Sequence, residues 1–217
     1  MNTIIDRFNK IKFNINNSNN INKKVNIIAV SKTFSYDYIK PLIEFGHIHF
    51  GENKVQEAEK KWKNIKSNNK NIKLHMVGKL QTNKVKKAIE LFDYIHSLDN
   101  QKLADTLSKN EKENNKKLNY FIQINIGNEK QKSGIPSDKI KDFYKYCTKE
   151  LSLNIIGLMV LPPNDGNEEK HFKSLYELNS LLGLKELSMG MSSDYLKALK
   201  FNSTFLRIGS AIFGSRN

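Results

Sequence analysis

The sequence predicts an α/β fold in which eight parallel strands, each followed by a helix, close into a single (β/α)8 TIM barrel. Short apolar runs alternate along the chain with segments of helical spacing, and this order implies parallel strands joined by crossover helices. There are eight such runs, the number of strands in this barrel. The 217 residues allow about 27 for each unit, so residues 1–217 are expected to form one domain without a second.

Each predicted element follows from its own pattern. Residues 1–24 are expected to hold an opening helix and an Asn-rich loop that begins at Asn14. The runs with the length and composition of buried strands are 25–32, 48–51, 74–78, 94–98, 120–126, 155–161, 186–190 and 205–213. The segments with helical spacing are 36–45, 55–65, 84–91, 102–113, 139–151, 168–182 and 194–199. An open doubly wound sheet is the alternative, but no Gly-x-Gly-x-x-Gly motif follows an early strand.

Composition excludes several classes of protein. An apolar fraction of 38% is enough to build a core, so the chain is not wholly disordered. A single cysteine, Cys147, excludes a disulfide-stapled scaffold, and no Cys and His cluster has the spacing of zinc ligands. No apolar stretch is long enough to span a bilayer, and the first residues do not resemble an export signal. These observations lead us to expect a cytoplasmic protein.

The chain is strongly basic, with 36 Lys and Arg against 22 Asp and Glu and a net charge of +14. Clustered basic residues would suggest nucleic-acid binding. Here the lysines are scattered and accompanied by Asn and Ile, which share A/T-rich codons with Lys, so genome composition is the preferred explanation. A barrel that binds nucleic acid stays as an alternative, and so does a general attraction for small anions.

Polar residues at the ends of the predicted strands are the first candidates for function, because chemistry in these barrels lies at the carboxyl ends of the strands. Lys32 ends the first run and shares a face with Ile28 and Val30. Desolvation there would lower the pKa of its amine and favour attack on a carbonyl to form a Schiff base, whereas the alternative is a lysine that extends to solvent. Asn53 ends the second run and could either bind a ligand or cap the next helix.

The last quarter of the chain carries a second group of candidates. Loops after the seventh and eighth strands of such barrels commonly bind phosphate. Ser192 and Ser210 offer hydroxyls there, and Gly209 allows close approach of the backbone. Arg207 is expected on the eighth strand, pointing into the barrel, where it needs either a ligand or a distant carboxylate. Together, Lys32, a phosphate cradle and an inward arginine match the aldehyde, phosphate and ring nitrogen of pyridoxal phosphate.

The same residues carry a resemblance to a known family. Seven motifs occur in order between about residues 27 and 216 and look like the signatures of the pyridoxal phosphate homeostasis proteins, which are similar to the N-terminal domain of alanine racemase; they lie at 29–33, 50–53, 80–84, 95–99, 157–159, 187–192 and 207–214. The resemblance implies a Schiff base on Lys32, phosphate contacts from Ser192, Gly209 and Ser210, Arg207 at the pyridine nitrogen, and Asn53 beside the ring. Two residues depart from the pattern: Ser210 stands where Thr is expected, and Lys79 stands where His or a small residue is expected.

The resemblance also implies a function. The family is regarded as carrying or regulating pyridoxal phosphate in the cell without established turnover, so we expect no enzyme, a monomer, and PLP-dependent apo-enzymes as candidate partners. Alanine racemase takes a catalytic tyrosine from a second domain that this chain is expected to lack. An arginine at the ring nitrogen would also keep the pyridine unprotonated and a poor electron sink. The alternative is a minimal PLP-dependent racemase or decarboxylase acting on amino acids.

The remaining titratable residues carry no functional prediction. His75 is expected in the barrel as a core residue whose polar atoms are satisfied. His47, His49, His96 and His171 have no partner at ligand spacing in the sequence and are expected to have structural or surface roles. Cys147 lies on an amphipathic segment and is expected to pack in the core.

Overall fold

The structure is a computed structural model that describes residues 3–18, 24–127, 129 and 133–215. The opening helix predicted within residues 1–24 is α1, Thr3–Asn16. Part of the predicted Asn-rich loop, residues 19–23, lies outside the described residues. None of the helices within the described residues combines the length and the apolar content needed to cross a bilayer.

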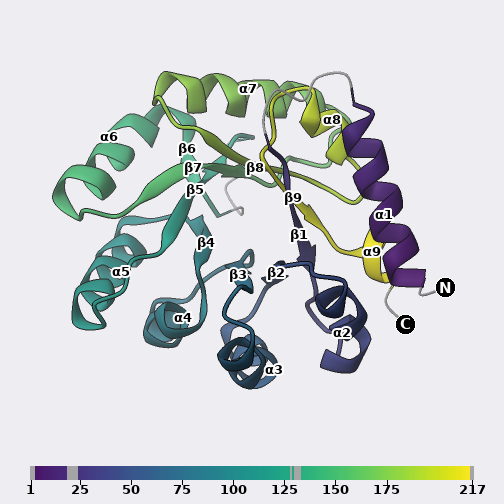
Figure 1. Cartoon of the computed structure of the whole chain (residues 1–217). Helices are drawn as coiled ribbons and strands as arrows, with labels where there is room; N and C mark the ends of the chain where they lie inside the picture. The colour runs from purple at the N-terminus through teal and green to yellow at the C-terminus, as the bar shows by residue number, and fades with distance from the viewer. Residues whose placement is uncertain (1–2, 19–23, 128, 130–132, 216–217) are drawn as a thin grey trace.

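Eight parallel strands form a closed ring, as predicted (Figure 1). The order around the ring is β4-β3-β2-β1-β9-β8-β7-β5, and pairing of β5 with β4 closes it. Their bounds are β1 Asn26–Val30, β2 His49–Glu52, β3 Lys73–Met76, β4 Tyr94–Leu98, β5 Asn119–Asn125, β7 Ile155–Val160, β8 Glu186–Met191 and β9 Phe205–Ile208. Because every pairing is parallel, all carboxyl ends of the strands meet at one mouth of the barrel.

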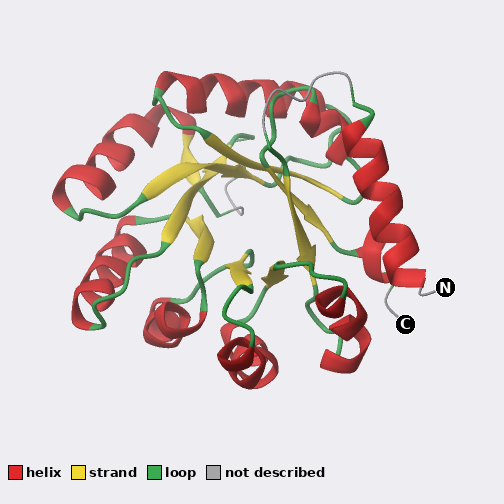
Figure 2. Ribbon diagram, viewed as in Figure 1, coloured by secondary structure: helices red, strands yellow, loops and turns green. Residues whose placement is uncertain are grey.

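Helices surround the strands, and Figure 2 shows the red helices outside the yellow ring. They shield the outer, apolar face of each strand, where most of the buried side chains lie. Besides α1 they are α2 Tyr36–Glu44, α3 Val55–Asn68, α4 Val85–Leu91, α5 Gln101–Glu113, α6 Ile140–Lys145, α7 Glu168–Leu181, α8 Tyr195–Leu199 and α9 Ser210–Phe213. Cys147 is fully buried in this layer, as predicted.

Three local features differ from the predicted elements. The apolar run 205–213 is not one strand: β9 ends at Ile208 and α9 begins at Ser210, because apolar composition alone does not separate a buried strand from a buried helix. The helix after β5 continues as a π-helical turn at Tyr146–Glu150. A two-residue strand that the sequence analysis did not predict, β6 Ile135–Pro136, pairs with β5 outside the ring.

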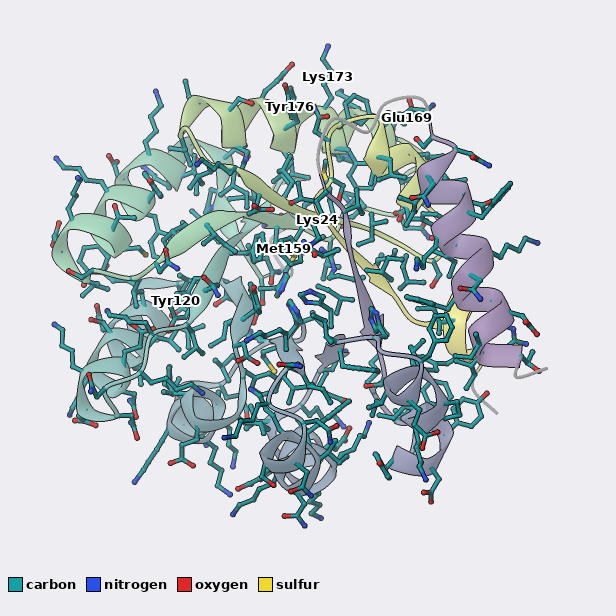
Figure 3. The ribbon with its side chains drawn as sticks, in the orientation of Figure 1. Lys24, Tyr120, Met159, Glu169, Lys173 and Tyr176 are labelled. Atoms are coloured by element: carbon teal, nitrogen blue, oxygen red, sulfur yellow. The ribbon has the colours of Figure 1, made fainter. Side chains whose placement is uncertain are left out.

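The interior of the ring has an apolar part and a polar part. Ile28, Val30, Phe121, Met159 and Phe205 pack together inside the strands, and Met159 is labelled near the middle of the ring in Figure 3. This filling makes the barrel a packed core rather than a pore.

The polar part is a row of three imidazoles, called here the histidine column: His49 on β2, His75 on β3 and His96 on β4. Nδ1 of His49 lies 2.9 Å from Nε2 of His75, and Nδ1 of His75 lies 3.0 Å from Nε2 of His96. His75 was predicted as a core residue and is fully buried. The expectation of separate structural or surface roles for His49 and His96 missed the column, because strand pairing brings together residues that lie 21 or more positions apart.

Acid is expected to destabilise the fold through this column. Burial lowers the pKa of His49 from 6.5 to about 4 and holds the pKa of His75 and His96 well below 6.5. Between about pH 6.5 and pH 4 the unfolded chain therefore binds protons that the folded chain does not, so the free energy of unfolding falls as the pH falls. His75 and His96 should each contribute up to about 1.4 kcal/mol per pH unit. Urea unfolding across this range measures the effect, and an unchanged free energy of unfolding would contradict it.

Gly157→Ala is expected to destabilise the ring between β7 and β8. A Cβ atom at Gly157 would overlap the backbone carbonyl oxygen of Glu186, which cannot move without distorting the strand pairing. The expected loss is about 1–3 kcal/mol, the usual cost of overpacking. Denaturant unfolding measures it. Gly166→Asn is the control, because Gly166 has a φ of +76° that Asn tolerates and nothing lies within 4 Å; an equal loss in both variants would refute the steric explanation.

Candidate cofactor pocket at the mouth of the barrel

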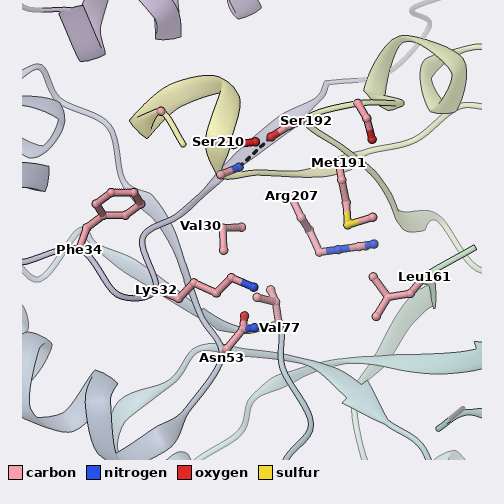
Figure 4. A pocket seen from close by; sticks show the side chains of 13 residues that line it. Val30, Lys32, Phe34, Asn53, Val77, Leu161, Met191, Ser192, Arg207 and Ser210 are labelled. Atoms are coloured by element: carbon pink, nitrogen blue, oxygen red, sulfur yellow. Dashed lines mark hydrogen bonds between the residues drawn. The ribbon is translucent and has the colours of Figure 1, made fainter. Parts of the chain in front are cut away.

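A cavity of about 600 Å³ opens where the carboxyl ends of β1, β2, β8 and β9 meet. This volume is in the range of small-molecule sites. All six residues predicted for the site line it: Lys32, Asn53, Ser192, Arg207, Gly209 and Ser210. Figure 4 shows Lys32 and Asn53 together on one side of the cavity, with Arg207 between Met191 and Leu161. The fold brings together predicted residues that lie up to 178 positions apart in the chain, whereas the apolar wall of Val77, Leu161 and Met191 was not predicted.

Lys32 reaches the cavity from a tight turn at the end of β1. The backbone N–H of Ser31 still donates to Gly51 of β2 at 2.9 Å, so the strand register holds up to the residue before Lys32. Thr33 then adopts a left-handed conformation with φ of 71°, and Phe34 donates back to the carbonyl of Ser31 at 3.2 Å. The turn projects Lys32 into the cavity from the wall that Val30 also lines, which confirms the predicted face.

A buried carboxylate fixes this turn from behind. Oε1 of Glu52 accepts hydrogen bonds from the Ser31 hydroxyl at 2.7 Å, from Nζ of Lys61 at 2.9 Å and from the Trp62 indole at 2.9 Å. Lys61 also donates to the carbonyl of Ser31 at 2.7 Å. Ser31, the residue before Lys32, is thus tied to helix α3 directly through its backbone carbonyl and indirectly through its hydroxyl, which shares Glu52 with Lys61 and Trp62.

Asn53 follows β2 and faces the cavity rather than the helix. Helix α3 begins at Val55, and the residue at its N-cap is Lys54. The alternative role of Asn53 as a helix cap is therefore wrong, and its amide is directed to the cavity beside Lys32 (Figure 4).

Arg207 is nearly fully buried on β9, and its partners are neutral. Nη1 donates to the carbonyl oxygen of Ser188 at 2.6 Å and to the Ser188 hydroxyl at 2.7 Å, while Nη2 donates to the carbonyl of Val160 at 2.7 Å. Among the described residues no carboxylate forms an ion pair with Arg207. The alternative, an ion pair with an Asp or Glu from a distant part of the sequence, is therefore wrong. Burial lowers the pKa of Arg207 to about 10, and the more distant charge of Asp194 partly opposes this change. The guanidinium stays charged at neutral pH.

The loops after β8 and β9 meet through Ser192. Its Oγ accepts hydrogen bonds from the backbone N–H groups of Gly209 and Ala211, each at 3.2 Å. The dashed line in Figure 4 marks the hydrogen bond from Gly209. Ser210, between these two donors, also lines the cavity. The region therefore combines backbone N–H groups and two hydroxyls, a donor set suited to the oxygens of an anion. Within the residues that the structure describes, no cluster of His, Cys, Asp or Glu could hold a metal ion.

A second cavity of about 410 Å³ adjoins the first and shares Asn53, Val77 and Leu161 with it. Lys79 lines this second cavity and not the first. Lys79, which departs from the family pattern, thus lies next to the first cavity rather than in its lining.

Comparison with known proteins agrees with this architecture. The family described as "Alanine racemase, N-terminal domain" matches residues 7–217. The pyridoxal phosphate homeostasis protein of Haemophilus influenzae is 37% identical over 96% of this chain and 92% of its own length. The protein of the same name from Escherichia coli is 33% identical, over 90% of this chain and 87% of its own length.

Solved structures give the same result. PipY of Synechococcus elongatus, determined with pyridoxal phosphate bound, has 30% identity and a TM-score of 0.86 and covers 97% of this chain and 100% of its own. Alanine racemase from Corynebacterium glutamicum has 14% identity and a TM-score of 0.74 over 97% of this chain and 60% of its own, which shows a shared fold alone. With its barrel matched over almost its whole length and its relatives more than 30% identical, the chain belongs to the pyridoxal phosphate homeostasis protein family.

Proposed function

We propose that this protein binds pyridoxal 5'-phosphate covalently through Lys32 and serves vitamin B6 homeostasis as a carrier or regulator rather than as an enzyme. The observation that carries the proposal is the arrangement of one primary amine, one buried guanidinium and one group of anion donors around a single cavity. Family membership and the pyridoxal phosphate bound to PipY support the choice of cofactor.

The residues of the cavity fit the cofactor group by group. Pyridoxal phosphate supplies an aldehyde, which condenses with a primary amine and releases water. Lys32 holds the amine, and Ser192, Gly209 and Ser210 would hold the phosphate. Arg207 would donate to the ring nitrogen, and Asn53 would lie beside the ring. The net charge of +14 favours the approach of such an anion from solution.

The lining of the cavity supports a role without turnover. Among the described residues that line it, Lys32 and Arg207 are the only titratable side chains; the others are Val30, Phe34, Asn53, Val77, Leu161, Met191, Ser192, Ser193, Gly209, Ser210 and Gly214. Racemisation needs groups that remove and return a proton on opposite faces of a substrate, and a guanidinium releases its proton poorly at neutral pH. The cavity therefore offers one suitable amine, which the proposal assigns to the covalent bond.

The proposal extends to the protein's partners. In this proposal the protein acts as a monomer, and PLP-dependent apo-enzymes receive the cofactor from the protein. This extension rests on the homeostasis role alone.

Lys32→Ala is expected to abolish the covalent complex. The wild-type protein incubated with pyridoxal phosphate should show the visible absorption band of a Schiff base. The variant should lack it, because no other side chain among the described residues that line the cavity carries a primary amine. Borohydride reduction followed by peptide mass mapping should find the pyridoxyl group on Lys32. Lys79→Ala, which alters the adjoining cavity, is the matched control and should keep the band. An adduct on Lys79 or Lys84 would move the linkage and refute this assignment.

The protein loaded with cofactor is expected to show no sustained reaction with amino acids. The alternative, a minimal racemase or decarboxylase, has the shared alanine racemase fold in its favour. Incubation with single L-amino acids, followed by measurement of the D-isomer and of carbon dioxide, separates the two. Turnover above that of free pyridoxal phosphate, lost in Lys32→Ala, would establish the enzyme instead.

A further inference from the structure

The hydroxyl of Ser188 links Arg207 to the histidine column. Its Oγ accepts from Nη1 of Arg207 at 2.7 Å and lies 2.8 Å from Nδ1 of His96. All three residues are buried, and no other polar group of the described residues is hydrogen bonded to this hydroxyl. The five groups Arg207, Ser188, His96, His75 and His49 therefore form one continuous chain of hydrogen bonds through the barrel.

The guanidinium of Arg207 determines which atom donates and which accepts in every hydrogen bond of this chain. A guanidinium only donates, so Ser188 Oγ is the acceptor in the first bond. If Nδ1 of His96 also donated to Oγ, the hydroxyl hydrogen of Ser188 would be buried without an acceptor, at a cost of about 1–3 kcal/mol. The hydroxyl of Ser188 therefore donates to Nδ1 of His96.

The direction of donation in the remaining hydrogen bonds of the histidine column follows from this first bond. Burial holds the pKa of His96 and His75 well below 6.5, so both rings are neutral near pH 7 and carry one N–H each. With Nδ1 of His96 accepting, its Nε2–H donates to Nδ1 of His75, and Nε2–H of His75 donates to Nδ1 of His49. All three rings are then Nε2–H tautomers, and every acceptor atom faces toward Arg207.

We propose that Ser188 and His96 are positioning residues that hold the guanidinium of Arg207 in the orientation required at the ring nitrogen of the cofactor. This inference rests on the proposed function, which places Arg207 at that nitrogen. Three of the five N–H donors of Arg207 are fixed by Ser188 and Val160, which leaves two for a ligand. The aligned bonds of the chain turn its negative ends toward the guanidinium and so stabilise a charge that has no paired carboxylate.

The first test needs neither a variant nor a cofactor. Histidine nitrogen shifts of the uniformly ¹⁵N-labelled apoprotein near pH 7 distinguish a protonated from a bare ring nitrogen. The expected result is a bare Nδ1 and a protonated Nε2 for His49, His75 and His96. A hydrogen on Nδ1 of His96 would overturn the proposal, because the chain would then be reversed at Ser188.

The second test compares two amides at position 96. The side chain of His96→Asn places its oxygen near the former Nδ1 and keeps an acceptor for Ser188, whereas His96→Gln reaches the former Nε2 and loses that acceptor. Both variants lose the stacking of the ring on Phe121, and the larger Gln fills more of the space that the ring leaves. His96→Gln is expected to weaken cofactor binding about tenfold, the effect of disturbing one hydrogen bond to a charged group, and His96→Asn at most about threefold.

The outcomes separate the two proposals. An equal loss of cofactor affinity in His96→Asn and His96→Gln would show that His96 acts only through packing and would overturn the inference. Wild-type affinity in both variants would overturn it as well. Ser188→Ala, which keeps the backbone bond to Arg207 and removes the hydroxyl, should weaken binding as much as His96→Gln. If the wild-type protein fails to bind pyridoxal phosphate, the proposed function falls, while the tautomers of the apoprotein still decide whether the chain is directed as inferred.

Discussion

The buried charge of Arg207 is the constraint on which the interior of this barrel depends. A guanidinium inside a protein needs either a paired carboxylate or a full set of oriented acceptors. Here the acceptors are carbonyl oxygens of β7 and β8 and the hydroxyl of Ser188, all neutral. Neutral imidazoles continue from that hydroxyl, because burial disfavours their protonation and, at His96, the charge of Arg207 disfavours it further. The polar half of the core is therefore organised around one cation.

The same arrangement bears on the chemistry of the cavity. A carboxylate beside Arg207 would neutralise it, and could also act as a base toward anything bound at the mouth. Neutral acceptors leave the positive charge of Arg207 without a paired carboxylate among the described residues. A site built in this way suits recognition and retention of an anionic aldehyde better than proton transfer, in agreement with the role proposed for the protein.

Much of the fold and of the site followed from local sequence. The alternation of apolar runs and helical segments predicted the ring, and the rule that function lies at the carboxyl ends of the strands was enough to select Lys32 and Asn53. Ser192, Gly209 and Ser210 were selected because they follow the last two strands, and all three line the cavity. The choice of pyridoxal phosphate was strengthened by the resemblance to a family, since position alone left a lysine that extends to solvent as the alternative.

What the sequence analysis missed depends on register and on three-dimensional neighbours. Ser188 reads as an ordinary small residue of a strand, and only the pairing of β8 with β9 and the closure of the ring place it between Arg207 and His96. The histidines are likewise unremarkable until parallel pairing aligns β2, β3 and β4. The break between β9 and α9 was missed because the run 205–213 is apolar over most of its length.

Glu52 connects the mouth of the barrel to a helix on its outside. Its carboxylate joins Ser31 to Lys61 and Trp62, so hydrogen bonds connect the turn that presents Lys32 to helix α3. A change in the position of α3 would therefore be transmitted through these hydrogen bonds to the turn that carries Lys32, without any contact inside the cavity.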